Sequence, residues 1–201
     1  SAPVWASIVV GCLASLVLPW YAVQDPPWYE VLPQVFGSAE AANGLWQAAS
    51  QGRPWLYAGA AGLLICALGA LIPAGRAQGR VLAFGGGAGF VLLVAAGLLI
   101  GARGWSVASF NTLFGELPVN QFGMGAGAFV ALTMLLMLAA FGVARLGFFQ
   151  GDLFVSAAVL GCGVLMAVFI AYPVSKGLGG AFLDEDGRAS LSAFVARLAG
   201  N

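Results

Sequence analysis

The side chains that could carry out chemistry are few and lie far apart. The 201 residues include no histidine, so the chain has no imidazole to bind haem, zinc or copper, or to act as the usual general base of a hydrolase. Cys12, Cys66 and Cys162 are widely separated, without the nearby second cysteine that a redox or metal pair requires. We therefore expect small buried thiols, no cofactor, and no enzymatic activity of the chain's own.

Charged side chains, which could carry protons or ions, are confined to the borders of apolar stretches. The 8 acidic and 8 basic residues all lie outside, or at the edges of, five uncharged windows. Because a charge inside a membrane is costly unless it is used, this placement argues against a proton pump or a pore for charged substrates. Asp152 comes closest, at the start of the fifth window, where we expect its carboxylate to cap a helix rather than to relay protons.

The uncharged windows predict the elements that would position these side chains. They run from Ser1 to Gln24, from Pro54 to Gly75, from Val81 to Ala102, from Leu117 to Ala144 and from Leu153 to Ser175. Each is long enough to cross a bilayer core of about 30 Å, which takes roughly 20 apolar residues. The composition agrees, because 61% of the residues are hydrophobic and 8% are charged, whereas soluble proteins have about 25% charged residues.

We predict an all-α integral membrane protein with about five transmembrane helices. The spans are placed at about 4–23, 54–73, 81–101, 123–143 and 153–173, within a transmembrane domain over residues 1–175. Residues 176–201 are expected to form an extracytoplasmic tail with a short amphipathic, interfacial segment. The apolar runs are continuous, which favours helices over the alternating strands of a membrane barrel.

The basic residues predict the orientation. Arg76 and Arg80 lie between the second and third spans, and Arg145 lies between the fourth and fifth. Because short cytoplasmic loops are enriched in Lys and Arg, we expect the N-terminus inside and the C-terminal tail outside. No basic residue precedes the first apolar run, so we expect it to be a retained helix and not a cleaved signal peptide.

Two sets of residues are candidates for anchoring and for helix packing. The expected interfacial anchors are Trp20, Tyr21, Trp28, Tyr29, Trp55, Tyr57 and Trp105. A binding site made by these aromatic rings is the alternative interpretation. Gly85 with Gly89, and Gly123 with Gly127, form G-x-x-x-G pairs that allow helix backbones to approach closely. Since the chain has 30 glycines, we expect these pairs to pack helices within the chain and not to mark a dimer interface.

The segment after the fifth span carries the most specific pattern. It contains Tyr172-Pro173, Ala181-Phe182-Leu183, the acidic turn Asp184-Glu185-Asp186-Gly187 and then Ser190-Leu191 followed by Phe194. In this order the segment resembles the stretch after the first core helix of binding-protein-dependent ABC permeases, most closely those of the iron(III) type. The resemblance covers roughly residues 160–200. The alternative is an ordinary acidic turn followed by an interfacial helix.

The resemblance implies that the fifth span is the first helix of a permease core and that the first four spans are added N-terminal helices. It implies iron transport across the bacterial inner (cytoplasmic) membrane, with an ABC ATPase and a periplasmic binding protein as partners. The Glu-Ala-Ala loop that docks on the ATPase in this family is not in the sequence, so we expect the chain not to couple ATP hydrolysis itself. The alternative is a truncated permease-like accessory subunit of a larger respiratory, photosynthetic or transport complex. In both cases we expect contact with lipid and other membrane subunits, and no nucleic acid.

Overall fold

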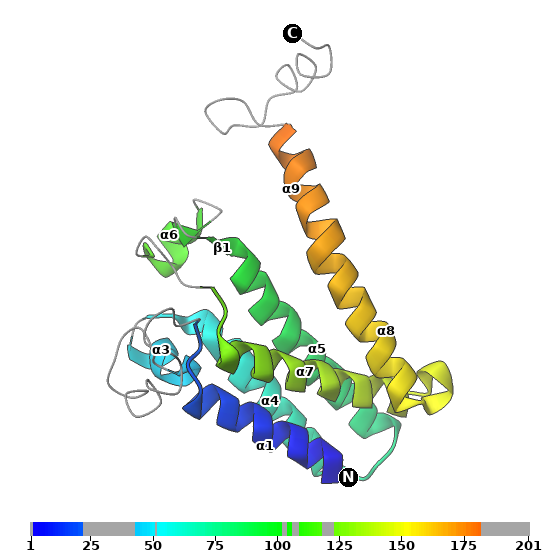
Figure 1. The fold of residues 1–201 in the computed structure, drawn as a ribbon. Helices are drawn as coiled ribbons and strands as arrows, with labels where there is room; N and C mark the ends of the chain where they lie inside the picture. Colours follow the sequence, from blue (N-terminus) through cyan, green and yellow to red (C-terminus); the bar gives the residue numbers. More distant parts are fainter. Residues whose placement is uncertain are drawn as a thin grey trace. The chain divides into compact units, whose positions relative to one another are not determined.

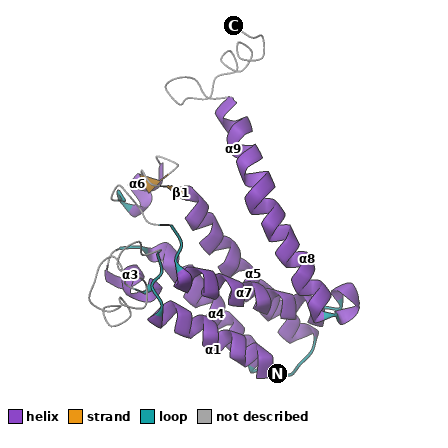
Figure 2. Ribbon diagram, in the orientation of Figure 1, coloured by secondary structure: helices purple, strands orange, loops and turns teal. Residues whose placement is uncertain are grey.

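Apolar helices packed side by side dominate the computed structural model, which describes residues 2–21, 43–50, 52–101, 104–105, 109–117 and 123–181 (Figure 1). The chain divides into two compact units, Ser1–Ala157 and Ala158–Asn201. Figure 2 shows that helix is the main secondary structure of the described residues, with strand limited to a short hairpin.

Four helices form a bundle in the first unit. They are α1 (Ala2–Val17), α4 (Tyr57–Ala70), α5 (Arg76–Leu99) and α7 (Ala126–Arg145). Helix α5 lies between α4 and α7, and α1 packs against α7 and α4. The core between them is made of aliphatic side chains and alanines, among them Val4, Leu63, Leu82, Leu135 and Leu138. Where the backbones of neighbouring helices approach most closely, the residues between them are small, chiefly glycine.

The bundle has two different ends. The turn end comprises the start of α1, the short α4–α5 turn 71–75 with the first turns of α5, the end of α7 and residues 146–152, which include the 3-10 segment η3 (Phe148–Gly151). The loop end comprises residues 18–21, 43–56, 100–117 and 123–125 where they are described. It holds α3 (Gly44–Ser50), the 3-10 turn η2 (Pro54–Leu56), the hairpin of β1 (Ile100–Gly101) and β2 (Gly104–Trp105), and α6 (Ser109–Phe114).

The second unit contains most of a long apolar helix that begins in the first unit. The helix consists of α8 (Leu153–Met166), the π-helical segment η4 (Ala167–Ala171) and α9 (Tyr172–Ala181). Pro173 has no backbone N–H, and in a regular α-helix its ring would crowd the carbonyl group of Phe169. The wider π turn just before Pro173 lets the helix continue past this residue.

Three helices are long and apolar enough to cross a membrane, namely Arg76–Leu99, Ala126–Arg145 and Leu153–Ser175, and two further apolar helices, Ala2–Val17 and Pro54–Ala70, are shorter. The predicted class, an all-α protein with apolar candidate membrane spans, is confirmed to this extent. Helix α1 ends at Val17, six residues before the predicted boundary, because Pro19 disfavours helical backbone at the residue that precedes it. Helix α5 begins at Arg76, before the uncharged window, so its first turns include two arginines.

Candidate functional site at the loop end

An extended segment after α1 fixes the wall of a small aromatic pocket. The carbonyl oxygen of Trp20 accepts a hydrogen bond from Gly125 N at 2.8 Å, and that of Pro19 accepts one from Gly127 N at 3.0 Å. Tyr21 forms an isolated antiparallel bridge with Met124. These bonds tie the end of α1 to the beginning of α7. Because Pro19 prevents the segment from continuing as a helix, its carbonyl groups are available to the backbone N–H groups at the start of α7. The rings of Trp20 and Tyr21 are thereby held at the loop end.

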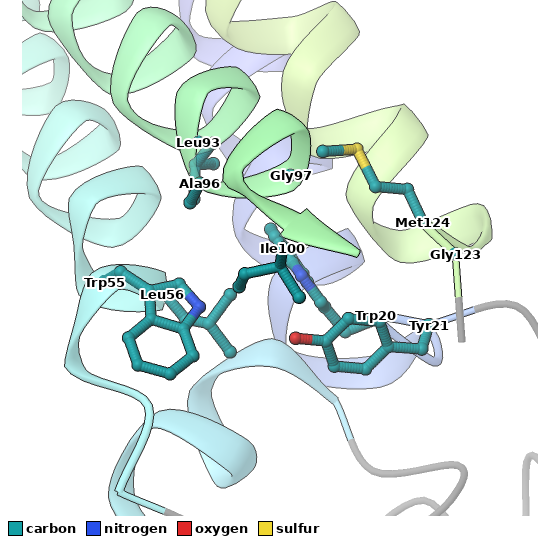
Figure 3. A pocket seen from close by; sticks show the side chains of 10 residues that line it. All are labelled: Trp20, Tyr21, Trp55, Leu56, Leu93, Ala96, Gly97, Ile100, Gly123 and Met124. Carbon is teal, nitrogen blue, oxygen red and sulfur yellow. The ribbon is translucent and has the colours of Figure 1, made fainter. Parts of the chain in front are cut away.

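The pocket has a volume of about 60 Å³ and a mainly apolar lining (Figure 3). Its lining residues are Trp20, Tyr21, Trp55, Leu56, Leu93, Ala96, Gly97, Ile100, Gly123 and Met124. The Met124 side chain lies directly against Gly97, where a Cβ atom would overlap its terminal methyl group. A pocket of this size has room for a few water molecules, whereas pockets for organic ligands are several times larger.

A buried polar group lies beside the pocket. Arg53, which is 9% exposed, donates a hydrogen bond from Nη1 to Gln47 Oε1 at 3.1 Å. Its guanidinium carbon lies 4.9 Å from the ring centroid of Tyr21, within the range of a cation–π interaction. The polar and aromatic partners together accommodate a cation that would otherwise be costly to bury.

Asn43 adds a second buried polar side chain at this end. Its Oδ1 accepts a hydrogen bond from Trp46 N at 2.8 Å, the geometry of an N-cap for α3. The other amide atom, Nδ2, is buried and has no hydrogen-bond partner in the described part of the chain. Neither Asn43 nor the pair of Arg53 and Gln47 was predicted as a site. The one signal in the sequence is a lone arginine directly before Pro54-Trp55, at the start of an uncharged window.

An aromatic cluster continues from the pocket toward α6. The rings of Trp55 and Trp105 meet edge to face with centroids 4.8 Å apart, and Phe114 lies 5.8 Å from Trp55 and 5.6 Å from Trp105. Phe110 completes the cluster at 5.4 Å from Trp105. Trp105 Nε1 donates a hydrogen bond to the carbonyl oxygen of Gly115 at 3.2 Å. Edge-to-face and tilted contacts of this kind are the favoured geometries of aromatic pairs.

The expected anchors that the structure describes lie at the loop end, and they differ in burial. Trp20 is buried and packs on Gly44, where a Cβ atom would be 2.5 Å from its ring. Tyr21, Trp55 and Trp105 are half-buried, and Tyr57 is exposed. The structure brings Trp20, Tyr21 and Trp55 together in the pocket and Trp55 with Trp105 in the cluster. Trp28, Tyr29 and the acidic turn Asp184, Glu185, Asp186 and Gly187 lie outside the described residues.

The four candidate glycines occupy different environments. Gly85 and Gly89 face α4, where Gly62 allows close approach: a Cβ atom at Gly62 would be 2.7 Å from the carbonyl oxygen of Gly85 and 3.0 Å from Cα of Gly89. Gly127 packs against the end of α1, with the carbonyl oxygen of Leu18 at 2.8 Å from such an added atom. Gly123 has open space around it. Close backbone approach thus occurs at three of these positions.

The described residues contain no group of three or more histidine, cysteine or carboxylate side chains that could hold a metal ion. What the fold and the two bundle ends define is an all-α protein with candidate membrane spans, an aromatic end and a basic end. Comparison with protein-family models, with curated proteins and with solved structures finds no match.

Proposed function

We propose that this chain is a non-catalytic membrane-spanning part of an ABC-type transport permease of the iron type. In this proposal α1, α4, α5 and α7 are added N-terminal helices, and the long helix from Leu153 is the first helix of the permease core. The observation that carries the proposal is the division of the chain into two compact units after Ala157. The boundary falls where the resemblance begins, at about residue 160, so the compact bundle and the permease-like segment are separate units of the chain.

The interior of the bundle supports a scaffolding role. Helices α4, α5 and α7 meet through glycines and alanines at near backbone contact. Their buried side chains are mainly aliphatic, and the polar exception, Gln78, lies in the first turn of α5. Such an interior is well packed and apolar, which suits a fixed support and does not suit the passage of an ion. A transported substrate would therefore move along surfaces supplied by the core helices and their partners.

The helix of the second unit has a feature expected of a moving core element. Its π-helical segment Ala167–Ala171 lies immediately before Tyr172 and Pro173. π turns and prolines are sites where a transmembrane helix bends, because the local hydrogen-bond ladder is interrupted. In the proposal this interruption lets the first core helix adjust when the permease changes conformation.

The proposal includes five membrane crossings in the bacterial inner membrane, with the turn end in the cytoplasm. The shorter helices α1 and α4 would complete the five spans together with their flanking residues. The positions of Arg76, Arg80 and Arg145 at the turn end support this orientation through the cytoplasmic preference of basic residues.

The test is mass spectrometry of the protein extracted from native membranes in mild detergent. We expect it to co-purify with an ABC ATPase and the remaining core helices of a permease. The accessory-subunit alternative predicts unrelated membrane proteins in the same preparation. Stable recovery with no ATPase would overturn the transport proposal, and the identity of the companions would then define the complex that it joins.

A further inference from the structure

Three arginines gather at the turn end of the bundle. Arg76 is the first residue of α5 and Arg145 is the last residue of α7, and both helices are candidate membrane spans. Because α5 and α7 are antiparallel neighbours (Figure 1), these two residues lie at the same end. Arg80 lies one helical turn further along α5, about 6 Å deeper. A membrane that accommodates both helices therefore has its surface at the level of Arg76 and Arg145.

One of the three guanidinium groups is held in place by a buried amide. Arg145 Nη1 donates a hydrogen bond to Oε1 of Gln78, and Gln78 is 1% exposed. Gly79 makes this possible, since a Cβ atom added there would be 3.0 Å from Cβ of Arg145. The backbone of α5 thus passes directly beside the end of α7. Arg76 and Arg80 are exposed, whereas Arg145 is half-buried.

The described residues contain two acidic side chains, Glu116, which follows α6 at the loop end, and Asp152 at the turn end. The described part of the turn end thus has three guanidinium groups and one carboxylate, and a net positive charge. The carboxylate of Asp152 caps α8, because its Oδ1 accepts a hydrogen bond from Val155 N at 3.0 Å. The guanidinium groups at the start of α5 and the end of α7 therefore create a positive potential at the turn end of the bundle. An anion at this face would be attracted from outside the chain.

Two phenylalanines follow Arg145 closely in the chain, in the loop after α7. Phe148 is 59% exposed and Phe149 is 43% exposed. Phe149 and Gln150 have φ angles of 51° and 58°, in a left-handed region that non-glycine residues rarely adopt. Strain of this kind is retained where the surrounding structure or a function requires it. The loop thus presents aromatic surface at the level of the membrane surface, where phenylalanine inserts into the boundary between headgroups and acyl chains.

We propose that the turn end binds an anionic phospholipid, with the lipid phosphate beside the exposed Arg76 and Arg80, Arg145 adding positive charge at the same level, and the upper acyl chains beside Phe148 and Phe149. The depth of Arg80 favours a lipid, because an arginine one turn inside a span extends its side chain toward the headgroup phosphates. Basic groups between helices at a cytoplasmic surface are a known arrangement for anionic headgroups. This inference rests on the proposed placement of the bundle in a membrane, and not on the transport role.

The test is native mass spectrometry of the full chain in mild detergent, titrated with phosphatidylglycerol and, separately, with phosphatidylcholine of the same acyl chains. We expect phosphatidylglycerol to bind more tightly. Substituting both exposed arginines, R76Q with R80Q, should weaken phosphatidylglycerol binding roughly tenfold and leave phosphatidylcholine unchanged. The matched control R76K with R80K retains the charge and should retain most of the preference.

A second pair of measurements separates a lipid from a free anion. F148A with F149A should weaken phosphatidylglycerol binding, whereas inorganic phosphate at the same concentration should fail to displace the lipid. Displacement by inorganic phosphate would make the occupant a free anion and overturn the proposal. Equal binding of the two lipids, or full binding by the folded R76Q with R80Q variant, would overturn it as well. The unfolding temperature of each variant, measured by tryptophan fluorescence, shows that it is folded.

Discussion

Gly86 of α5 lies against the backbone of Leu135 in α7 so closely that a Cβ atom at Gly86 would be 2.6 Å from the Leu135 carbonyl oxygen. The backbone nitrogen of Ala139 would be equally near, at 2.6 Å. Gly142 makes the reciprocal contact, since a Cβ atom there would overlap the backbone of Ala83. Real side chains do not tolerate such distances, so the crossing of α5 and α7 requires glycine at both positions. Backbone approach of this kind is how helices gain packing energy in lipid.

Replacing Gly86 with alanine is expected to destabilise the bundle. The added methyl group meets backbone atoms, which cannot rotate away, so the two helices must separate. Overpacking of this kind costs about 1–3 kcal/mol. The measurement is the free energy of unfolding in mixed detergent micelles, followed by tryptophan fluorescence. The expected result is a lower free energy of unfolding with the native fold retained at low denaturant.

The neighbouring Gly87 is the matched control, because it has no atom within 4 Å of an added Cβ. Gly87→Ala should leave the stability unchanged or raise it by up to about 1 kcal/mol, since alanine is the better helix former. Both substitutions replace glycine by alanine in adjacent helical positions, so opposite effects on stability would come from the contact of Gly86 with α7 and not from helix propensity. Equal destabilisation by both substitutions would contradict the assigned face of α5.

Asp152 is expected to act through helix capping. Its Oδ1 accepts a hydrogen bond from Val155 N at 3.0 Å. Asp152→Ala should therefore lower the free energy of unfolding by about 1 kcal/mol, whereas Asp152→Asn should retain most of it, because asparagine is an equally good N-cap. Thermal unfolding in detergent measures both. A loss of stability in the asparagine variant as large as in the alanine variant would show that the charge matters beyond the cap.

Much of the fold follows from the sequence because the bilayer imposes a simple rule. Uncharged windows of sufficient length predict helices, and α5, α7 and the helix from Leu153 fall within a few residues of three predicted spans. The boundaries were less predictable at α1, where Pro19 ends the helix early, and at α5, which extends back to Arg76. The two arginines in its first turns stay at the surface end, so charge did not stop the helix. An uncharged window marks where charged residues begin, and not where the helix begins.

The site was harder to predict because it depends on pairing between distant segments. The aromatic residues were identifiable from their positions at the ends of windows, and interfacial anchoring stays a prediction for the exposed Tyr57. The burial of Trp20 on Gly44, and of Arg53 between Gln47 and Tyr21, arises from how residues 43–56 fold over the end of α1. Nothing in the local sequence indicates that contact. G-x-x-x-G spacing similarly identified Gly85 and Gly89 but missed Gly86 and Gly142. The close contacts of these two glycines are with the backbone of the neighbouring helix and do not follow from spacing within one helix.

The contact between Arg53 and Tyr21 is expected to stabilise the loop end. Because the guanidinium group is buried at 4.9 Å from the ring centroid, replacing the ring with an aliphatic side chain removes a cation–π interaction. Tyr21→Leu should cost about 1–2 kcal/mol. Tyr21→Phe keeps the ring and should be close to neutral. Unfolding monitored by tryptophan fluorescence distinguishes the two, and equal losses in both variants would assign the effect to the hydroxyl group instead.

The two ends of the bundle are expected to face opposite sides of the membrane. Gln78 is buried and bonded to Arg145, so the exposed Ala77 is the better position for a cysteine at the turn end, and the exposed Ser50 reports on the loop end. With the native cysteines Cys12, Cys66 and Cys162 replaced by alanine, Ser50→Cys should react with a membrane-impermeant maleimide on intact spheroplasts. Ala77→Cys should react only in inverted vesicles. The reversed pattern would place the N-terminus outside. Labelling of both positions from the same side would contradict a membrane crossing by α4, which lies between them in the chain.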